Sequence, residues 1–365
     1  MKTPLLGIMA LYMNNRKQLE ERKFFAKLIA VGHKMGISAY VFTPEDVDGR
    51  QRQILAHCYD LNRGTWYRKT MPFPDVVFDR CRYQATPRFQ QLRRFRAKYP
   101  NLLYMNRPMA NKWAVYRDLR EHDSIARYLP ETELFQSVEQ LKEFLDRKTS
   151  VYLKPINGTG GRGILRVEKL GPHQYLVQGR DAKRRILSAK KAGPLLLKQM
   201  LSDLCKEKKY LIQEGIDTRL SNGRVHDFRA LVQKNGSGEW RLTGVAARIG
   251  PSGSVTSNLH GGGRAVRMDA LLRSRFGKTS TVQEIQEDME QLCLKVAKEL
   301  NRKYGALCEL ALDIAVDRRA GVWLLEVNPK PAREVFARIG DKLTYLRAIR
   351  RPLEYALWLY RHKRS

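Results

Sequence analysis

The chain has 365 residues, 43% of them hydrophobic and 29% charged, which is ordinary for a globular protein and long enough for two or three domains. No run of 18 apolar residues occurs, so the sequence excludes a membrane-spanning helix. Lys and Arg number 68 against 37 Asp and Glu, and the resulting formal charge of +31 is spread along the whole chain. Such a charge attracts polyanions and anionic substrates, although a general compositional bias with no polyanionic partner explains it equally well.

The N-terminal segment holds a short apolar run, residues 5–9, that resembles the hydrophobic part of a signal peptide. One positive charge precedes this run, and no cleavage site of small residues follows it. A buried first strand is therefore the better interpretation, and we expect a cytoplasmic protein.

Strands and helices alternate through the first third of the chain. Apolar runs predict the strands, and the helical stretches between them predict the helices. This rhythm indicates an α/β domain, residues 1–108, with a mainly parallel sheet. The predicted strands are residues 5–9, 38–42, 76–78 and 102–104, and the predicted helices are residues 16–34 and 88–99.

The rest of the chain predicts two further domains, residues 109–214 and 215–365. In the first, helix 111–122 precedes a glycine-rich loop between two strands, and the lysine-rich stretch 171–193 stays unassigned. In the second, antiparallel-type strands surround a long helix, and a C-terminal helix kinked at Pro352 is expected to dock on its own domain. The further strands are 151–154, 164–167, 210–213, 228–233, 240–249, 309–316 and 322–327, and the further helices are 195–206, 282–304 and 343–363.

The cysteines are scattered, with no CxxC pair, which argues against a disulfide framework and against a structural zinc site. We expect reduced thiols in the core. The five positions are Cys58, Cys81, Cys205, Cys293 and Cys308.

The most informative segment is residues 151–163, VYLKPINGTGGRG, in which a predicted strand with a lysine leads into a glycine-rich loop. Its glycines fit the GxGxxG pattern, but a dinucleotide-binding fold needs a helix next, and residues 164–167 predict a strand. Protein kinases place their lysine on a later strand and carry an HRD motif, which is absent. The segment FGKT, residues 276–279, ends like a P-loop, yet Leu272 stands where the first glycine is required.

With these alternatives excluded, the loop is a glycine hairpin preceded by Lys154. Glycines let backbone amides approach phosphate oxygens closely, and the lysine adds a positive charge. We therefore predict a lid that binds phosphates, and a merely flexible hairpin is the lesser interpretation. The loop residues in question are Gly158, Thr159, Gly160, Gly161 and Gly163.

A second segment predicts a metal site. Glu326 and Asn328 are two residues apart on a predicted strand, so their side-chain oxygens face the same way. Asp313, near the end of the neighbouring strand, supplies a third oxygen. Mg²⁺ prefers a few such oxygens together with phosphates and water. The alternative is an ion pair between Glu326 and Lys330 or Arg333.

Together these segments resemble the ATP-grasp superfamily, as in glutathione synthetases and RimK-like ligases, over roughly residues 111–338. The whole chain, including GIMA at 7–10 and PDVVFD at 74–79, is most similar to the YheC/YheD family, which is described as endospore coat-associated. The resemblance implies an α/β (α+β) ATP-grasp fold behind an N-terminal α/β domain. Further segments that carry it are NKW at 111–113, LIQEGI at 211–216, DFR at 227–229 and SNLHGG at 257–262.

The resemblance also implies which residues bind ATP. Lys112 and Lys154, with the glycine hairpin, would hold the phosphates. The segment that borders the adenine and the ribose comprises Gln213, Glu214, Ile216 and Asp217.

Three further residues are implied to face the reacting groups: Arg229, Arg248 and Asn258. A surface salt bridge explains Arg248 equally well. The implied ligands of Mg²⁺ are Asp313, Glu326 and Asn328, with two ions expected and Mn²⁺ as a substitute.

The expected function is an ATP- and Mg²⁺-dependent ligase that joins a carboxylate to an amine or a thiol through an acyl phosphate. The rival is a nucleotide-binding spore-coat protein without ligase activity, whose charge serves adhesion to an acidic polymer or a coat partner. The intact set of metal ligands argues against simple decay of the activity. Sequence-specific binding of nucleic acid is disfavoured, because no helix–turn–helix or aromatic platform is present. The sequence names neither the acid nor the amine.

Overall fold

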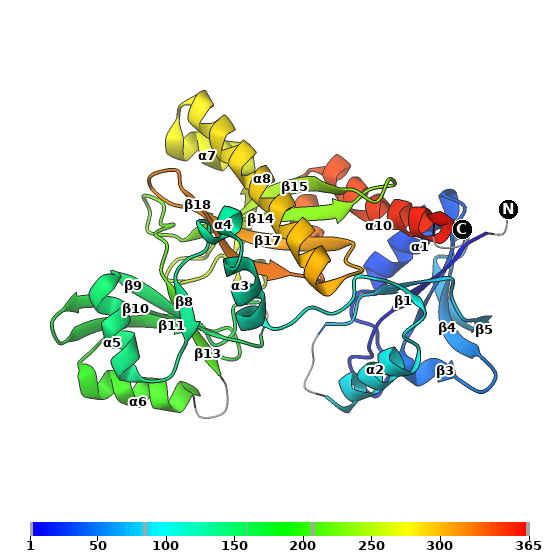
Figure 1. Ribbon diagram of the computed structural model, residues 1–365, viewed down its shortest axis with the longest axis horizontal. Helices are drawn as coiled ribbons and strands as arrows, with labels where there is room; N and C mark the ends of the chain where they lie inside the picture. Colours follow the sequence, from blue (N-terminus) through cyan, green and yellow to red (C-terminus); the bar gives the residue numbers. More distant parts are fainter. Residues whose placement is uncertain (1–2, 83–85, 159, 206–208, 363–365) are drawn as a thin grey trace.

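The computed structural model describes residues 3–82, 86–158, 160–205 and 209–362, except for the side chains of residues 203–205 and 260. Its strands form three sheets, drawn from the N-terminal, middle and C-terminal parts of the chain. In Figure 1 the first and second sheets lie at opposite ends of the molecule, with the third above and between them. The prediction of a mixed α/β fold is confirmed, whereas the predicted domain boundaries stay a prediction.

The first sheet contains the parallel strands predicted from the apolar runs. Its order is β3-β4-β2-β1-β6-β7, and β2, β1, β6 and β7 run parallel. A hairpin, β4 and β5, joins it antiparallel and was not predicted. The strands are β1 (Leu5–Met9), β2 (Ser38–Phe42), β3 (Val47–Asp48), β4 (Gln53–Asp60), β5 (Thr65–Pro72), β6 (Val76–Asp79) and β7 (Leu103–Met105), and a short 3-10 helix, η1 (Pro44–Asp46), precedes β3.

Two helices belong to this sheet, α1 (Arg22–Lys34) and α2 (Pro87–Lys98). Helix α1 begins six residues later than predicted. The reason is local, because the Asn14 carboxamide accepts a hydrogen bond from the Arg16 amide at 3.0 Å, and Lys17 has a φ of 55°. Both features hold a turn that a helix cannot contain.

The second sheet is antiparallel throughout, in the order β12-β11-β10-β9-β13-β8. The lysine-rich stretch left unassigned forms the two adjacent strands at one end of this sheet, β11 and β12, and every side chain of β12 except Ala192 is exposed. Two helices, α5 and α6, pack their apolar side chains on the sheet. The elements are β8 (Thr132–Leu134), α5 (Val138–Arg147), β9 (Ser150–Pro155), β10 (Leu165–Gly171), β11 (Gln174–Arg180), β12 (Ile186–Ala192), α6 (Pro194–Cys205) and β13 (Tyr210–Glu214).

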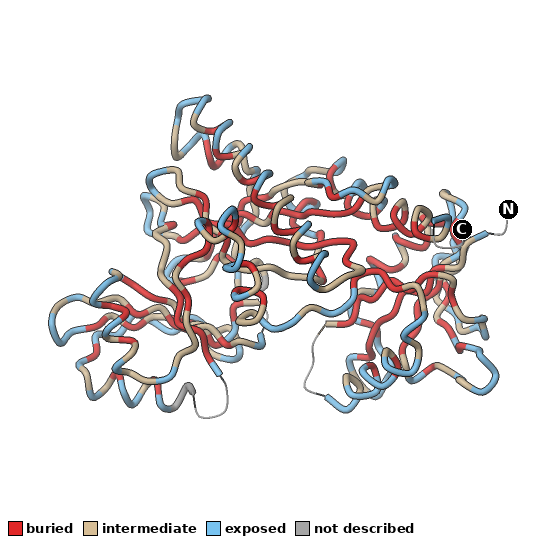
Figure 2. The backbone as a smooth tube through the Cα atoms, viewed as in Figure 1, coloured by how far each residue is buried: buried red, intermediate tan, exposed pale blue. Residues whose placement is uncertain are grey.

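The third sheet is also antiparallel, in the order β16-β15-β14-β17-β18. Helix α8 (Thr279–Tyr304) lies along it and buries Val282, Met289 and Val296 in the largest apolar cluster. Figure 2 shows the central strands buried along their length. The other elements are β14 (His226–Lys234), β15 (Trp240–Ile249), β16 (Arg264–Arg267), β17 (Glu309–Val316), β18 (Val322–Asn328), α3 (Lys112–Arg120), α4 (Asp123–Ala126), α7 (Met268–Phe276), α9 (Glu334–Arg338) and the 3-10 helix η2 (Leu259–Gly261).

The C-terminal helix α10 (Lys342–His362) continues through Pro352. It packs on the third sheet, as predicted, and also on α1, where Ile349 and Leu353 join the apolar cluster of the first sheet. The red and blue helices lie together in Figure 1. Helix α10 therefore connects the first and third sheets.

A buried ion network, which we call the junction network, also joins these two sheets. The Arg80 guanidinium contacts Glu309 at 2.6 Å and Glu21 at 3.0 Å, and Arg333 forms an ion pair with the same Glu309. Burial would raise the pKa of Glu21, but Arg80 and Arg82 outweigh it and lower that pKa. Lys330 completes the network, because its ammonium lies 3.4 Å from the Asp79 carboxylate and donates to the Asn106 carbonyl.

Two compositional expectations are met within the described residues. Four cysteines, Cys58, Cys81, Cys293 and Cys308, are buried and without disulfides, and the side chain of Cys205 lies outside this part of the chain. Among the residues that the structure describes, no helix has the length and apolarity needed to cross a membrane.

Candidate active site

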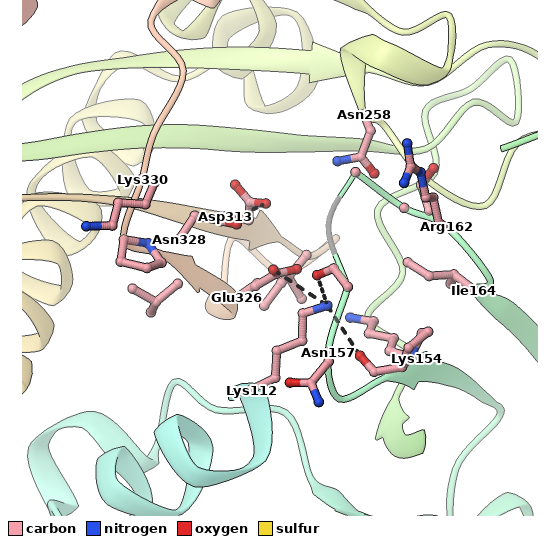
Figure 3. Close-up of a pocket in the computed structure, with 18 of the residues that line it drawn as sticks. Lys112, Lys154, Asn157, Arg162, Ile164, Asn258, Asp313, Glu326, Asn328 and Lys330 are labelled. Carbon is pink, nitrogen blue, oxygen red and sulfur yellow. Dashed lines mark hydrogen bonds and ion pairs between the residues drawn. The ribbon is translucent and has the colours of Figure 1, made fainter. Parts of the chain in front are cut away.

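The three sheets surround one large cleft of about 2160 Å³. Its lining includes the N-terminal part of α3, the glycine loop after β9, the end of β13 and the edges of β14, β15, β17 and β18. Figure 3 shows the labelled side chains converging there from these separate elements. Segments about 170 residues apart in the sequence therefore meet at one site.

Charged side chains cross the third sheet in register. Asp227 on β14 is opposite Arg248 on β15, and Arg229 on β14 is opposite Asp313 on β17. Asp313 is in turn opposite Glu326 on β18. Because residues two apart on a strand share a face, Asp227 and Arg229 both point into the cleft. These charged residues are isolated from one another in the sequence. The register between the strands brings them together in one charged row.

The row is tightly paired. Arg248 binds Asp227 through two hydrogen bonds, of 2.7 Å from Nε and 2.5 Å from Nη2, and its Nη2 lies 3.2 Å from Asp313 Oδ1. Arg229 donates to Asp313 Oδ2 at 3.0 Å. Burial would raise the pKa of Asp313, but the guanidinium groups of Arg229 and Arg248 outweigh it and lower that pKa. Arg248 is 3% exposed, so the alternative of a surface salt bridge is wrong.

The predicted metal ligands lie together at the β17–β18 edge. Asn328 Nδ2 is 3.5 Å from Asp313 Oδ2, and Glu326 is the cross-strand neighbour of Asp313. Neither alternative partner pairs with Glu326: Lys330 and Arg333 belong to the junction network. The cation nearest to Glu326 is Lys112, at 3.7 Å.

This donor set fits Mg²⁺ in its chemistry. Two carboxylates and an amide offer hard oxygen ligands beside a cleft with room for phosphates and water. No group of three or more His, Cys, Asp or Glu side chains suited to a metal occurs within the described part of the chain. Asp313 Oδ1 also lies buried without an aligned hydrogen bond. Arg229 Nε lies 2.5 Å from that oxygen and Arg248 Nη2 lies 3.2 Å from it, so a cation bound there would share or replace these contacts.

Lys112 connects the β17–β18 edge to the glycine loop. Asn111 caps α3 by accepting from the Ala114 amide at 3.1 Å, which fixes Lys112 in the first turn. The Lys112 ammonium donates to the Gly158 carbonyl at 3.0 Å and lies 3.7 Å from Glu326. Figure 3 draws these contacts as dashed lines. One side chain therefore spans the two segments whose meeting the sequence predicted.

Lys154 points into the same cleft from β9. Its ammonium donates to Gln213 Oε1 at 2.5 Å, and Gln213 Nε2 donates to Thr132 Oγ1 at 3.0 Å. Burial lowers the pKa of Lys154 to about 8, with Glu326 opposing this shift and Lys112 adding to it. The nearest partner of this lysine is thus a neutral amide, which leaves its charge available to phosphates.

The glycine loop lies against the segment that contains Asn258. Gly160 and Gly161 have φ of 70° and 75°, a region that favours glycine. A Cβ on Gly161 would stand 2.6 Å from Asn258 Oδ1, so a side chain there would require Asn258 or the loop to shift. Gly158 and Gly163 also line the cleft, and Thr159 lies outside the described residues.

Only part of the segment predicted to border the adenine and the ribose lines the cleft. Gln213, Glu214 and Ile216 line the cleft, and Glu214 lies 3.1 Å from the Lys148 ammonium. Asp217 does not line it, because its carboxylate forms ion pairs with Arg219 at 2.9 Å and Arg318 at 3.0 Å. The predicted contact of Asp217 with a ribose therefore has no support in this geometry.

Sequence reasoning missed the cationic side chains of the second sheet. Arg162, in the loop, and Arg184, in the β11–β12 turn, line the cleft, and Arg180 at the end of β11 is buried beside them. The signal was the alternation of Tyr175, Val177 and Gly179, which marks a strand ending at Arg180. The many charged residues in the stretch 171–193 obscured this alternation in the sequence.

Solved structures share the overall arrangement. The D-cycloserine synthetase DcsG aligns with a TM-score of 0.57 at 13% identity, covering 96% of this chain and 99% of that chain. The D-alanine–D-alanine ligase of Coxiella burnetii gives 0.55 at 10% identity, covering 99% and 98%. The ATP-grasp ligase PsnB with a minimal precursor gives 0.53 at 13% identity, covering 98% of this chain and 99% of that chain. The protein therefore has the ATP-grasp fold.

The family is narrower than the fold. The family model described as "YheC/D like ATP-grasp" matches residues 101–359. Two proteins of Bacillus subtilis (strain 168) align over most of their length: "Endospore coat-associated protein YheC", 29% identical over 92% of this chain and 91% of that protein, and "Endospore coat-associated protein YheD", 27% identical over 98% and 79%. The chain belongs to the YheC/D-like ATP-grasp family, as the sequence motifs indicated.

Proposed function

We propose that the protein is an ATP- and Mg²⁺-dependent ligase that joins a carboxylate to an amine or a thiol. The observation that carries this proposal is the position of Lys112, whose ammonium contacts both the glycine loop at Gly158 and the metal edge at Glu326. A triphosphate between those two elements would meet cations on one side and a cation-binding edge on the other. The shared fold with ligases supports this assignment.

The proposed reaction has two steps. The acid's carboxylate attacks the γ-phosphorus of ATP, which forms an acyl phosphate and releases ADP, and the amine then displaces phosphate. Lys112, Lys154 and Arg229 offset charge on the moving phosphoryl group. The ligands Asp313, Glu326 and Asn328 would hold Mg²⁺, which supplies further neutralisation of the phosphate oxygens. The glycine loop excludes water that would hydrolyse the intermediate.

Release of ADP tests the proposal. Purified protein is mixed with Mg-ATP and pools of amino acids and acidic peptides, and a pool that stimulates release is then divided. In the stimulated reaction, Lys154→Ala and Glu326→Ala should each lower turnover by about 10²-fold or more, since each removes a charge aimed at the phosphates or their metal.

The matched controls are Lys169→Ala and Glu239→Ala, whose side chains form ion pairs with Asp146 and Arg241 outside the cleft. These controls should keep wild-type turnover. Undiminished turnover in both site variants would contradict the assignment of the site.

The second candidate is a coat protein that binds nucleotide without ligating anything. The names of the two Bacillus subtilis relatives and the charge of +31 favour it. Binding of Mg-ADP that depends on Lys154, with no pool stimulating ADP release, would favour this candidate over the ligase.

A further inference from the structure

Three arginine side chains gather where the second sheet meets the segment 254–261, and we call them the arginine cluster: Arg162, Arg180 and Arg184. The Arg184 guanidinium packs on the glycine loop, with Nη2 only 2.9 Å from where a Cβ on Gly160 would stand. Arg180 is 1% exposed and donates to Ser254 Oγ at 2.8 Å and to the Gly261 carbonyl at 2.8 Å. The cluster therefore lies between the lid and the Asn258 segment.

No carboxylate of the described residues pairs with these arginines. The acidic side chain closest in sequence, Asp181, is held by Arg185 at 2.6 Å. Burial lowers the pKa of Arg180 and of Arg184, and a like charge lowers each further, Arg184 for the first and Arg162 for the second. A partly buried cluster of one sign is costly unless an anion joins it.

Two polar atoms at the cluster lack partners. Arg184 Nε and Thr256 Oγ1 are buried with no hydrogen-bond partner among the described residues. Thr256 belongs to the segment facing the lid, since its Oγ1 would be 3.2 Å from a Cβ on Gly161. A donor in the β11–β12 turn and a hydroxyl on the segment that faces the lid thus both lack a hydrogen-bond partner among the described residues.

The β11–β12 turn holds Arg184 in an unusual backbone conformation. Its φ is 69°, a region where glycine or asparagine is ordinarily found. The Arg184 amide donates to the Asp181 carbonyl at 3.0 Å, and the Asp181 carboxylate accepts from the Lys183 and Arg185 amides at 2.8 Å each. The turn is therefore well defined and presents the guanidinium to the cleft.

The cluster lies apart from the two lysines expected to bind the triphosphate, although Arg162 belongs to the glycine loop. Figure 3 shows Arg162 beside Asn258, at the far end of the glycine loop from Lys112. Lys112 and Lys154 lie instead in the electrostatic neighbourhood of Glu326 and Asp313. An anion at the cluster would therefore come from a different part of the bound molecules.

We propose that the arginine cluster binds a second anionic group of the acid substrate, a carboxylate or phosphate carried in addition to the carboxylate that reacts. This inference rests on the proposed ligase function and narrows the substrate to a compound with at least two negative charges. Guanidinium groups suit such a ligand because they bind carboxylate and phosphate oxygens in pairs.

Titration calorimetry with two probes, tetra-glutamate and inorganic phosphate, tests the proposal. Each probe is added to protein saturated with Mg-ADP, so that the lysines proposed to bind the nucleotide, Lys112 and Lys154, are already occupied. Arg162→Gln and Arg184→Asn should each weaken probe binding by roughly tenfold, the effect of losing one charge-assisted pair. Asparagine tolerates the backbone of position 184, and Arg162 is exposed, so both variants should fold.

The matched control is Arg185→Gln, which removes the same charge from the next position, outside the cleft. Wild-type probe binding in this variant supports the proposal, and an equal loss would mean unspecific attraction by the protein's charge. The proposal is overturned if neither probe binds the wild type, or if the cluster variants weaken Mg-ADP and leave the probes unaffected. Failure of ADP release with intact, cluster-dependent probe binding would count against the ligase alone.

Discussion

The junction network and the arginine cluster both bury guanidinium groups, yet they surround them differently. Arg80 and Arg333 share Glu309 and reach Glu21, so each buried positive charge has a carboxylate. Arg180 has only hydroxyl and carbonyl acceptors, and Arg184 is beside another arginine. Paired buried charge connects parts of a fold, whereas unpaired buried charge marks a place for a ligand. The contrast separates architecture from binding in a protein that is basic everywhere.

Replacement of Arg80 should give the largest effect. Arg80→Met leaves Glu309 and Glu21 buried with fewer cations, which should lower the free energy of unfolding by about 3–5 kcal/mol. Urea denaturation followed by circular dichroism measures this change. Lys69→Met, an exposed cation on β5, serves as the control and should unfold like the wild type. If both variants unfold alike, the junction network does not stabilise the fold.

The pH dependence of nucleotide binding should give the next effect. Lys154, like the arginine cluster, has a neutral partner, but a lysine can lose its proton. With its pKa at about 8, the Lys154 amine is neutral at higher pH when no nucleotide is bound. Binding of phosphates above pH 8 must therefore be accompanied by uptake of a proton by Lys154. The affinity for Mg-ADP should fall by about tenfold per pH unit above pH 8.

Calorimetry between pH 7 and 9.5 measures this dependence, and Lys154→Arg, which stays charged, should abolish it. The same shift affects folding with the opposite sign. Between pH 8 and the ordinary value of 10.5 the unfolded chain keeps the proton that the folded protein has lost, so this group makes stability rise with pH. A wild-type affinity that is flat up to pH 9.5 would show that Lys154 does not bind the phosphates.

Replacement of Arg180 should give the smallest change in stability. Arg180→Met removes a buried charge that has no carboxylate, along with a few hydrogen bonds to neutral acceptors. The two effects oppose each other, and the net loss should be no more than about 1 kcal/mol. The measurement is the same urea titration used for Arg80→Met, so the two arginines are compared directly. A loss as large as that of Arg80→Met would mean that Arg180 has a structural role and that the comparison fails.

Much of the fold was predictable because the relevant strands contain long runs rich in apolar residues. Strands β15 and β17 have the bounds that their apolar runs predict, and the strands of the parallel sheet lie within a residue or two of theirs. The hairpin β4–β5 was missed for the opposite reason. Most side chains of β5 are exposed or half-buried. Trp66 is followed two positions later by the charged Arg68, so no apolar periodicity marks this segment as a strand.

The sequence predicted which segments form the candidate site. It did not predict which side chains pair with one another there. Glu326 and Asn328 share a face because they are two apart on a strand, which sequence alone dictates. That Glu326 faces Lys112 and that Asp217 turns toward Arg318 depend on the register between strands and on loops that fold over them. Those choices are made by tertiary packing, and no spacing along the chain records them.

The outermost strand of the second sheet has a consequence for how copies of the protein meet. Seven residues of β12 present an open row of backbone amides and carbonyls, the usual template for an added strand. Lys190 and Lys191 are exposed on this strand and point to its opposite faces. Two molecules paired along β12 would bring these like charges together, and we expect the repulsion to disfavour self-association through this strand.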